Sequence, residues 1–462
     1  MVEIRVDFDR KIKKMKPLHG FNNCARQVDY GPVLPDFFAL RPPVVRLHDT
    51  AYPYGAGHYV DINNVFPDFS ADPDDENAYD FTLTDLYIKP LCENGIDVMY
   101  RLGATIEHAP KKYHIFAPSD PEKWARVCEH IVRHYREGWA DGFYFPQIKY
   151  WEIWNEPDGL DPKIEPYGPP NWIGTAGEYY RLYSVTAKYL KEKHPDVLVG
   201  GYSSCYILGK NAGGKWTEGD TSYFTDFLAH VKKTGAPLDF FTWHGYLGNQ
   251  GTKKIDREFA FVDRTLSEYG FSDTLRVDAE WNCCVCDVDT PDYRNQFYIN
   301  MRNEKGASHI AAALYEMQRC GVDLATFYDA QLWKEYGPLF HVPGLEKTKT
   351  YRAFEQFLRL YEAGEERFST QGGEVYALAV AGKAKILALS NTNPEEKEVI
   401  IHTSGTDVPI SFRICDREHD LVEIPLPDLS GPVVLPPYSF CDISFRSRVP
   451  RPESRGAEIC AR

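Results

Sequence analysis

The sequence predicts an α/β protein, a (β/α)8 TIM barrel followed by a smaller C-terminal β-sandwich domain. Three observations lead to this prediction. Short apolar segments alternate with amphipathic helical segments over most of the chain. The helical pattern then stops, and short strands separated by turn residues follow it. The 462 residues are enough for one barrel with long loops and one appended domain.

Eight apolar segments are predicted to be the barrel strands, because strands buried on both faces have nearly continuous apolar sequences. They are Leu18–Asn22, Val44–His48, Ile96–Leu102, Ile148–Trp154, Val197–Gly201, Phe240–His244, Leu275–Glu280 and Leu324–Tyr328. Alternation of strands and helices favours a parallel sheet with right-handed crossovers. A doubly wound sheet is the alternative, but no glycine-rich nucleotide fingerprint follows the first strand.

Amphipathic segments between these strands are predicted to be helices. They are Pro121–Trp139, Ala176–Lys193, Ser222–Lys233, Asp256–Glu268, Asp292–Arg319 and Thr350–Ala363. The first of them follows Asp120, a good N-cap, and starts with a proline, which suits a first helical turn. The first βα unit shows no clear helix, and Thr50–Asn77 has the composition of a long insertion.

The C-terminal region has only strand patterns after Gly364. Its predicted strands are Glu374–Ala381, Lys385–Asn391, Glu398–Thr403, Ile410–Cys415 and Phe440–Phe445. Val2–Phe8 alternates apolar and charged residues, so we expect this strand to join the β-sandwich. The predicted division is therefore an N-terminal strand in 1–14, a catalytic barrel in 15–345, an exit helix and β-sandwich in 346–448, and a polar tail in 449–462.

The composition bears on which partners the protein can bind and on its cellular compartment. With 67 acidic and 52 basic residues the formal net charge is −15, which disfavours nucleic acid and anionic membranes as partners. No apolar run approaches the roughly 20 residues of a membrane span, and the N-terminus lacks the apolar core of a signal peptide. The 11 cysteines are an odd number scattered along the chain, and the cluster of Cys283, Cys284 and Cys286 does not have the spacing of a zinc knuckle. We expect a cytoplasmic protein with reduced thiols, and a secreted mature form is the alternative.

Polar residues end most of the predicted strands, and barrel enzymes carry their catalytic groups at these C-terminal ends. The segments are Arg46-Leu47-His48-Asp49 on the second strand, Trp154-Asn155-Glu156-Pro157 on the fourth, Trp243-His244-Gly245-Tyr246 on the sixth, Asp278-Ala279-Glu280-Trp281-Asn282 on the seventh and Phe327-Tyr328-Asp329 on the eighth.

Two glutamates are therefore expected in one barrel mouth, Glu156 and Glu280. A pair of carboxylates flanking the scissile bond is what glycoside hydrolysis requires. Arg46 could keep Glu280 ionised, and Asn155 could hydrogen-bond a sugar hydroxyl. Asp278 lies two residues before Glu280, so strand alternation predicts that it faces the same side but lies deeper. We therefore expect it to serve a structural role. Flat aromatic faces for sugar rings are expected from Trp154, Trp243, Trp281 and Tyr328.

Several motifs together resemble a known family. IKYWEIWNEPDG resembles the acid/base segment of clan A glycoside hydrolases, and RVDAEWN resembles their nucleophile segment. HGFNN, VVRLHD, YWEIWNEP, FFTWHGY and VDAEWN occur in the order typical of glycoside hydrolase family 39, the family of β-xylosidases and α-L-iduronidases. KTKTYRAFEQFLRLYEAGEERF and VYALAVAGKAKILALSNTN resemble its exit helix and β-sandwich, so the resemblance covers most of the chain.

The resemblance implies a retaining exo-glycosidase that uses no metal or other cofactor. Glu156 would be the general acid/base and Glu280 the nucleophile, with carboxyl groups roughly 5–5.5 Å apart. Arg46 would support the nucleophile. The candidate substrate-binding residues are Asn155, His48, Asp49, His244, Tyr246, Trp154, Trp281 and Tyr328. The expected partner is a glycoside or oligosaccharide, and family xylosidases are often homo-oligomers.

Two departures leave the sugar open. Leu47 and Asp49 flank His48 where the family's xylosidases usually have glycines, and Tyr328 stands where they have a tryptophan. We expect a β-xylosidase-like enzyme acting on a terminal neutral pentose. The alternatives are exo- or endo-action on α-L-arabinosyl, glucosyl or uronic-acid substrates. Outside this class, a non-catalytic sugar-binding protein and a metal-dependent barrel lyase or isomerase using His48, Asp49 and His244 remain.

Overall fold

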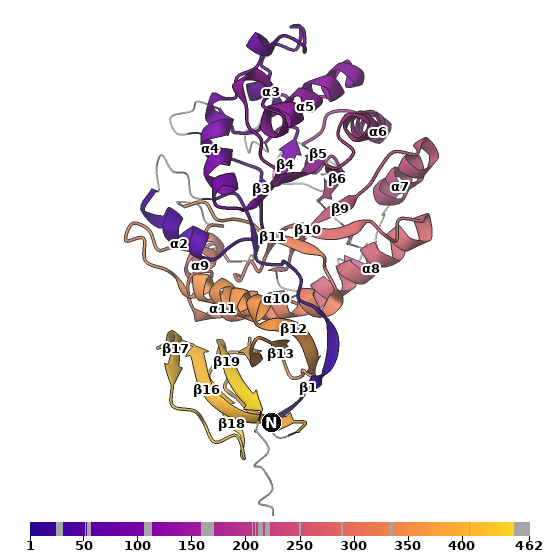
Figure 1. The fold of residues 1–462 in the computed structure, drawn as a ribbon. Helices are drawn as coiled ribbons and strands as arrows, with labels where there is room; N and C mark the ends of the chain where they lie inside the picture. The colour runs from indigo at the N-terminus through magenta and orange to yellow at the C-terminus, as the bar shows by residue number, and fades with distance from the viewer. Residues whose placement is uncertain are drawn as a thin grey trace, which may run out of the picture. The chain divides into compact units, whose positions relative to one another are not determined.

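The computed structural model describes residues 1–24, 31–50, 52, 57–105, 113–158, 171–205, 207, 209–210, 216–217, 222–248, 251–287, 290–332, 336–405 and 407–447. The chain divides into two compact units (Figure 1). One is Lys16–Leu358, and the other combines Met1–Met15 with the chain from Arg359 onward.

The first unit is built on a closed barrel of eight parallel strands, so the predicted TIM barrel is confirmed. In order around the barrel the strands are β2 (Gly20–Asn22), β3 (Val44–Leu47), β4 (Asp97–Leu102), β5 (Ile148–Ile153), β6 (Leu198–Ser204), β9 (Phe240–Tyr246), β10 (Leu275–Asn282) and β11 (Leu324–Phe327). Apolar side chains from several strands, among them Met99, Phe240 and Val277, pack into one core cluster. The strand ends are therefore held by a packed core rather than by an open pore.

Helices surround the barrel strands in Figure 1. They are α2 (Leu34–Ala39), α3 (Ile62–Val65), α4 (Thr82–Glu93), α5 (Pro121–Arg136), α6 (Ala176–Lys193), α7 (Ser222–Thr234), α8 (Lys253–Tyr269), α9 (Tyr293–Asn300), α10 (Glu304–Cys320) and α11 (Lys349–Ala363). Short 3-10 turns lie at Gly31–Val33, Glu76–Ala78 and Trp139–Asp141, and β7 (Gly209–Lys210) pairs with β8 (Trp216–Thr217). Helix α6 starts with a capping box, in which Thr175 and Glu178 each bond the other's backbone N–H.

The single helix predicted for Asp292–Arg319 is wrong, because the chain breaks there into α9 and α10. Asn303 interrupts the pattern and caps α10 by accepting a hydrogen bond from the backbone N–H of Lys305 at 2.9 Å. Gly306 permits the close turn, since a Cβ there would lie 2.4 Å from the carbonyl oxygen of Asn300. An asparagine with strong local hydrogen-bonding options thus overrides the helical periodicity.

The second unit is a nine-stranded mixed sheet that folds around one apolar core, as expected for a β-sandwich. Its order is β17 (Asp420–Ile424), β16 (Asp407–Cys415), β19 (Ser439–Ser447), β14 (Lys385–Asn391), β13 (Val375–Gly382), β12 (Gly364–Ser369), β1 (Val2–Lys14), β15 (Lys397–Thr403) and β18 (Val433–Leu435). The sequence did not predict β12, β17 and β18, whose segments are short or polar.

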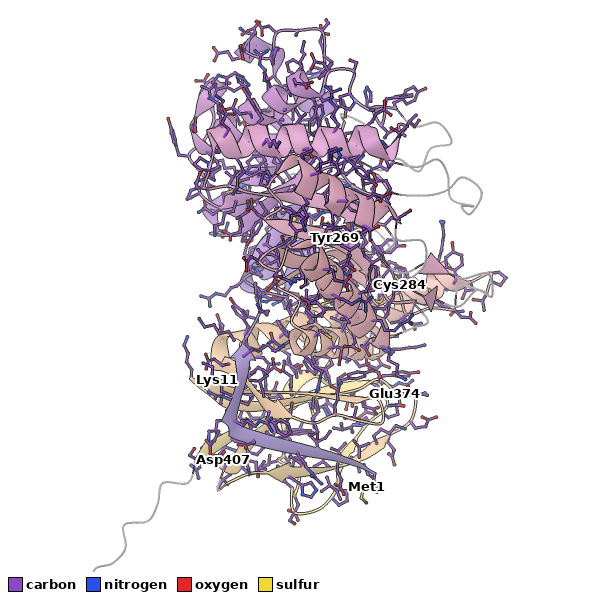
Figure 2. The ribbon with its side chains drawn as sticks, turned by 90° about the vertical axis from the view of Figure 1, so that its right-hand side faces the viewer. Met1, Lys11, Tyr269, Cys284, Glu374 and Asp407 are labelled. Atoms are coloured by element: carbon purple, nitrogen blue, oxygen red, sulfur yellow. The ribbon has the colours of Figure 1, made fainter. Side chains whose placement is uncertain are left out.

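Strand β1 belongs to this sheet, pairing antiparallel with β12 and parallel with β15. It bends between Met1 and Lys11 (Figure 2), and its register with β12 is irregular between Asp7 and Lys11. Its alternating side chains Ile4 and Phe8 are buried in the core of the sheet.

The remaining expectations concern the tail, the domain boundary, membrane-spanning helices and the cysteines. The polar tail lies outside the described residues, and the functional boundary at 345/346 stays a prediction. Within the described ranges, none of the helices has the length and apolar composition that crossing a bilayer requires. The described cysteines form no disulfide with one another.

Candidate active site

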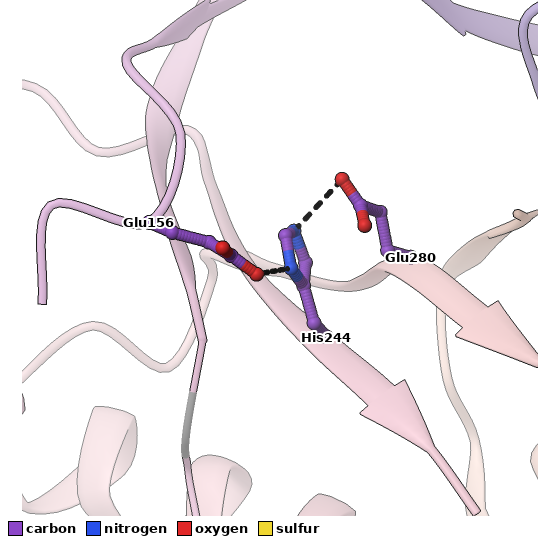
Figure 3. A group of neighbouring side chains, drawn as sticks. All are labelled: Glu156, His244 and Glu280. Carbon is purple, nitrogen blue, oxygen red and sulfur yellow. Dashed lines mark hydrogen bonds and ion pairs between the residues drawn. The ribbon is translucent and has the colours of Figure 1, made fainter. Parts of the chain in front are cut away.

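Two carboxylates and an imidazole meet at the C-terminal ends of three barrel strands (Figure 3). Glu156 follows β5, His244 belongs to β9 and Glu280 belongs to β10. His244 lies between the glutamates, with Nδ1 2.6 Å from Oε1 of Glu156 and Nε2 3.5 Å from Oε1 of Glu280. One oxygen of each carboxylate lies within 4.8 Å of the other. The two strand ends thus present both carboxylates to one space, as the sequence predicted.

Arg46 connects these groups to the barrel interior. Its side chain is fully buried, with Nε donating to Oε2 of Glu152 and Nη1 to Oε1 of Glu280, each at 2.7 Å. Burial opposes the charged guanidinium, but the two carboxylates outweigh it and raise the pKa of Arg46 above its ordinary value. The remaining acceptors of Arg46 are Asn22 Oδ1 at 2.9 Å, Asn155 Oδ1 at 2.6 Å and Ser203 Oγ at 2.7 Å.

The Glu280 carboxylate is held from both oxygens. Tyr246 donates its hydroxyl to Oε2 at 2.8 Å, while Arg46 donates to Oε1. Burial raises the pKa of Glu280, and the nearby charges of Glu156 and Asp49 add to this. His244 and Arg46 act in the opposite direction. Donors on both oxygens favour the ionised form of a carboxylate that burial would otherwise neutralise.

His244 is a buried, neutral imidazole. Burial lowers its pKa to about 4, although the charge of Glu280 opposes this shift. Its Nε2 also lies 2.9 Å from Oγ of Ser203, at the end of β6, and Ser203 in turn lies 3.0 Å from Oε1 of Glu152. Both Ser203 and Glu152 were missed by the sequence analysis. His244 therefore contacts Glu156 through Nδ1, and Ser203 through Nε2. Ser203 in turn contacts Arg46 and Glu152.

Asp49 and Tyr328 form a second polar group in the mouth. Tyr328 donates its hydroxyl to Oδ2 of Asp49 at 3.0 Å, and Nε2 of His48 lies 3.2 Å from Oδ1. The rings of Tyr246 and Tyr328 are 6.3 Å apart, and Tyr336 lies 5.5 Å from Tyr328. Tyr336 was not predicted, because it lies in the loop after the eighth strand and no pattern marks it. Aromatic rings and a carboxylate thus stand beside Glu280.

Backbone strain is concentrated at these strand ends. Trp154, Glu156 and Ser203 have φ angles of 70°, 47° and 61°, in the left-handed region that side chains other than glycine rarely adopt. Asp49 shares this conformation at 57°. The backbone N–H of Glu156 donates to the carbonyl of Ser203 at 3.0 Å, which fixes the end of β5 against β6. Conformations of this kind cost free energy and cluster at functional sites.

Two predicted substrate contacts, Trp154 and Trp281, lie in the packed interior instead. Trp281 is fully buried, with its ring 5.0 Å from that of Phe327. Trp154 is 2 % exposed and donates Nε1 to the carbonyl of Asn171 at 2.9 Å. Both rings are covered, so the structure does not support their expected role as open sugar platforms. Asn171 also donates to the carbonyl of Asn155 at 2.8 Å, so Trp154 helps to fix the loop that carries Glu156.

Asp278 does not share the face of Glu280 as the strand alternation predicted. The register of β10 against β9 shifts between the two residues, and this irregularity breaks the alternation. Asp278 accepts a hydrogen bond from the backbone N–H of Gly245 at 3.0 Å and lies near Glu258 and Lys254 of α8. A Cβ on Gly245 would lie 2.3 Å from this carboxylate, so the position requires glycine.

Two groups of side chains among the described residues have the spacing of metal ligands. They are Glu156, His244 and Glu280, and separately Asp256 of α8 with Glu316 and Cys320 of α10. The first group shares only His244 with the set of His48, Asp49 and His244 that was considered for a metal-dependent barrel lyase or isomerase. Its carboxylate Glu280 already receives two charged or polar donors, Arg46 and Tyr246, which compete with a cation.

Residues 40–262 match the model of the family described as glycosyl hydrolases family 39. A beta-xylosidase from Geobacillus stearothermophilus is 26 % identical over 215 residues, which are 44 % of this chain and 38 % of that protein. A beta-xylosidase from Caldicellulosiruptor saccharolyticus is 27 % identical over 137 residues, 29 % of this chain and 23 % of that protein. The matches thus span less than half the length of these relatives.

Solved structures share the fold over nearly the whole chain. A glucosidase from Croceicoccus marinus superimposes with a TM-score of 0.73 and 20 % identity, covering 97 % of this chain and 99 % of that one. A monomeric beta-xylosidase from Caulobacter crescentus CB15 gives a TM-score of 0.62 and 16 % identity, covering 97 % and 100 %. A GH51 alpha-L-arabinofuranosidase from Thermotoga petrophila RKU-1 gives 0.63 and 17 %, covering 96 % and 100 %.

Proposed function

Because residues 40–262 match the model of glycosyl hydrolases family 39, we propose that the chain is a retaining glycosidase of this family, with Glu156 as general acid/base and Glu280 as nucleophile. The observation that carries this proposal is the distance between the two carboxylates, which approach within 4.8 Å at their nearest ligand atoms. Retaining enzymes place the pair roughly 5–5.5 Å apart, whereas inverting enzymes leave about 6.5–9.5 Å for a water molecule. The spacing therefore favours double displacement over inversion.

In the first step, an oxygen of Glu280 attacks the anomeric carbon while Glu156 gives its proton to the departing glycosidic oxygen. The glycone is then held as an ester on Glu280. In the second step Glu156 takes a proton from water, and the resulting hydroxide oxygen displaces Glu280 from the anomeric carbon. Arg46 and Tyr246 stabilise the carboxylate that leaves, because each donates a hydrogen bond to one of its oxygens.

The glycone is proposed to be a terminal neutral pentose, as in a β-xylosidase. Asp49, Glu156 and Glu280 bring three carboxylates to the mouth, which would repel a uronic acid. The carboxylate of Asp49 is a natural acceptor for sugar hydroxyls. The curated relatives are beta-xylosidases, which agrees with this choice. Glucosyl and α-L-arabinosyl glycones, and endo-action, remain the alternatives.

Asn155 is proposed to bind the sugar hydroxyl next to the reacting carbon. Its Oδ1 is fixed by Arg46 at 2.6 Å, so its Nδ2 is the group left to donate. That nitrogen is buried and has no hydrogen-bond partner within the part of the chain that the structure describes. A substrate hydroxyl would satisfy it, and an unsatisfied buried donor costs about 1–3 kcal/mol.

A panel of aryl glycosides tests the proposal: β-xyloside, α-L-arabinofuranoside, α-L-arabinopyranoside, β-glucoside, β-glucuronide and α-L-iduronide. The wild type runs beside Glu156→Ala and Glu280→Ala, with Glu122→Ala on the surface of α5 as the matched control. We expect hydrolysis of the β-xyloside, abolished in Glu280→Ala and unchanged in Glu122→Ala. The first sugar released, followed by NMR, should have the anomeric configuration of the substrate.

The variants also separate the rival functions. Full turnover by Glu280→Ala would contradict the assignment of the nucleophile, and an inverted first product would contradict the double displacement. Calorimetric binding of xylo-oligosaccharides without hydrolysis of any of them would favour a sugar-binding protein. Hydrolysis of oligosaccharides but of no aryl glycoside would favour endo-action.

A further inference from the structure

The hydroxyl of Ser203 lies within hydrogen-bonding distance of three polar side chains of the site. Its side chain is fully buried, and its Oγ is 2.7 Å from Nη2 of Arg46, 3.0 Å from Oε1 of Glu152 and 2.9 Å from Nε2 of His244. A serine hydroxyl has one hydrogen and two lone pairs, so it can satisfy three neighbours in only a few ways.

The donor and acceptor properties of these three neighbours favour one placement of the hydrogens. The guanidinium of Arg46 is only a donor, so it occupies one lone pair of Oγ. The Glu152 carboxylate is only an acceptor, and hydrogen bonds to ionised acceptors are the stronger ones, so the hydroxyl hydrogen points to Glu152. The second lone pair of Ser203 then faces Nε2 of His244, which must carry the hydrogen. Oε1 of Glu280, 3.5 Å from the same nitrogen, favours a hydrogen there as well.

The proton on Nε2 determines what happens at the other ring nitrogen. Because burial lowers the pKa of His244 to about 4, the neutral ring has one N–H, and Nδ1 carries a lone pair. Oε1 of Glu156 lies 2.6 Å from this Nδ1. Two acceptors do not approach so closely without a hydrogen between them, so the hydrogen belongs to Glu156.

We propose that Ser203 is a positioning residue that fixes His244 as the Nε2–H tautomer and thereby keeps the reacting proton on Glu156. This rests on the proposed role of Glu156 as general acid. The side chain of Ser203 does not touch the reacting atoms and acts through His244. In the first step the protonated Glu156 is ready to donate, and after donation the lone pair of Nδ1 favours its return to the protonated form by uptake of a proton from water.

Charged groups from several strands surround this relay. Glu280 of β10 and Asp158, which follows β5, act on Glu156, and Arg46, Asp49, Glu152 and Glu280 act on His244. Oε1 of Glu280 lies 3.5 Å from Nε2 of His244, whereas Oγ of Ser203 lies at 2.9 Å. Ser203 is therefore the better acceptor for a hydrogen on Nε2. Without the hydroxyl, His244 can adopt the Nδ1–H form and donate to an ionised Glu156, which lowers the pKa of that carboxyl.

Two substitutions remove the hydroxyl with different effects on the backbone. Ser203 has a φ of 61°, so Ser203→Gly relaxes the main chain while Ser203→Ala leaves it strained. For both we expect the alkaline limb of kcat/KM to move to lower pH by about one unit. Ser184→Ala on α6, which removes another buried hydroxyl that contacts Thr234 at 3.2 Å, should leave the limb in place. A shift in Ser203→Ala alone, or in neither variant, would overturn the proposal.

The tautomer can be read directly, without turnover. We suggest 15N-histidine labelling of the full chain at neutral pH, with the His244 signals assigned by their absence in His244→Gln. The wild type should show Nε2 protonated and Nδ1 unprotonated, and Ser203→Gly should lose this preference. A protonated Nδ1 in the wild type would refute the proposal, even if the Ser203 variants failed to fold. Full turnover by Glu156→Ala would instead refute the proposed role of Glu156 as general acid/base. The spectrum reports the His244 tautomer whether or not the enzyme turns over substrate, so the two failures can be told apart.

Discussion

The guanidinium of Arg46 and the carboxylate of Glu280 form a buried salt bridge with an N–O distance of 2.7 Å. The two residues belong to β3 and β10, which are not neighbours in the barrel. The same guanidinium serves Glu152 of β5, so one cation neutralises part of the charge of two carboxylates. This network fixes the position of Glu280 from the interior and leaves its other oxygen to Tyr246.

We predict that Arg46→Met destabilises the fold and impairs the site together. Glu152 and Glu280 would lose their cation inside the barrel, and breaking a buried pair in this way costs about 3–5 kcal/mol. Loss of the positive charge also raises the pKa of Glu280 further, so the acidic limb of kcat/KM should move to higher pH. Urea unfolding and a pH profile measure the two effects.

Arg126→Met is the matched control for this variant. Arg126 pairs with Asp74 at 2.6 Å on the surface, and exposed pairs of this kind contribute about 0–1 kcal/mol. If Arg46→Met unfolded at the same urea concentration as the control, the buried network would not have the importance given to it here.

Tyr246→Phe should weaken catalysis while leaving the fold almost unchanged. The substitution removes one hydroxyl, the donor to Oε2 of Glu280 at 2.8 Å. Hydrogen bonds to charged groups contribute about 1.5–3 kcal/mol, so kcat/KM should fall roughly tenfold to hundredfold. Tyr180→Phe on α6 removes a hydroxyl that donates to the carbonyl of Tyr223 at 2.9 Å, and should keep full activity. Equal activity of the two variants would argue against a role for Tyr246.

The barrel and its two glutamates could be predicted because both leave local signals. Strands buried on both faces have apolar sequences, and their polar ends mark the mouth. The same rule located Arg46 and His244. It failed for Ser203, because the predicted strand stopped at Gly201 whereas β6 continues to Ser204. Glu152 had a signal that was not used, since a carboxylate inside an apolar strand requires a buried partner.

The errors in the site follow from side-chain direction. Trp281 is the neighbour of Glu280, and neighbours in a strand point to opposite faces, so its burial against Phe327 follows from the alternation. The position of Asp278 could not be foreseen, because it depends on a register shift against β9 that no sequence pattern reports. The contacts of Tyr336 depend in the same way on the path of a loop.

Asp49→Asn should change the choice of sugar more than the chemistry. The neutral amide no longer repels a carboxylate, and it replaces the carboxylate that we propose as an acceptor of sugar hydroxyls. Oδ2 of this carboxylate lies 3.0 Å from the hydroxyl of Tyr328. We expect kcat/KM on the β-xyloside to fall about tenfold, by the loss of one charged hydrogen bond. The ratio of β-xyloside to β-glucuronide hydrolysis should narrow.

Asp72→Asn is the control for this change, because Asp72 lies on the surface and accepts only a local backbone hydrogen bond in the described structure. A ratio that stays constant in Asp49→Asn would contradict the role proposed for Asp49 in excluding uronic acids.

Stability should fall in acid because two histidines are buried in their neutral form. Burial lowers the pKa of His19 to about 3 and that of His244 to about 4. In the unfolded chain both should titrate near 6.5, so between that pH and about 4 the unfolded state binds more protons. Their contribution to the free energy of unfolding is therefore complete above pH 6.5 and is lost progressively as the pH falls.

His19→Gln isolates the contribution of a histidine outside the proposed catalytic group. Whatever its stability at pH 7, this variant should lose about 3 kcal/mol less than the wild type when the pH falls from 7 to 4. His402→Gln, at an exposed position in the second unit, should follow the wild-type curve. Urea unfolding at a series of pH values gives the slopes directly. Parallel curves for His19→Gln and the wild type would mean that His19 is protonated in the folded protein, and its burial would then need an acidic partner.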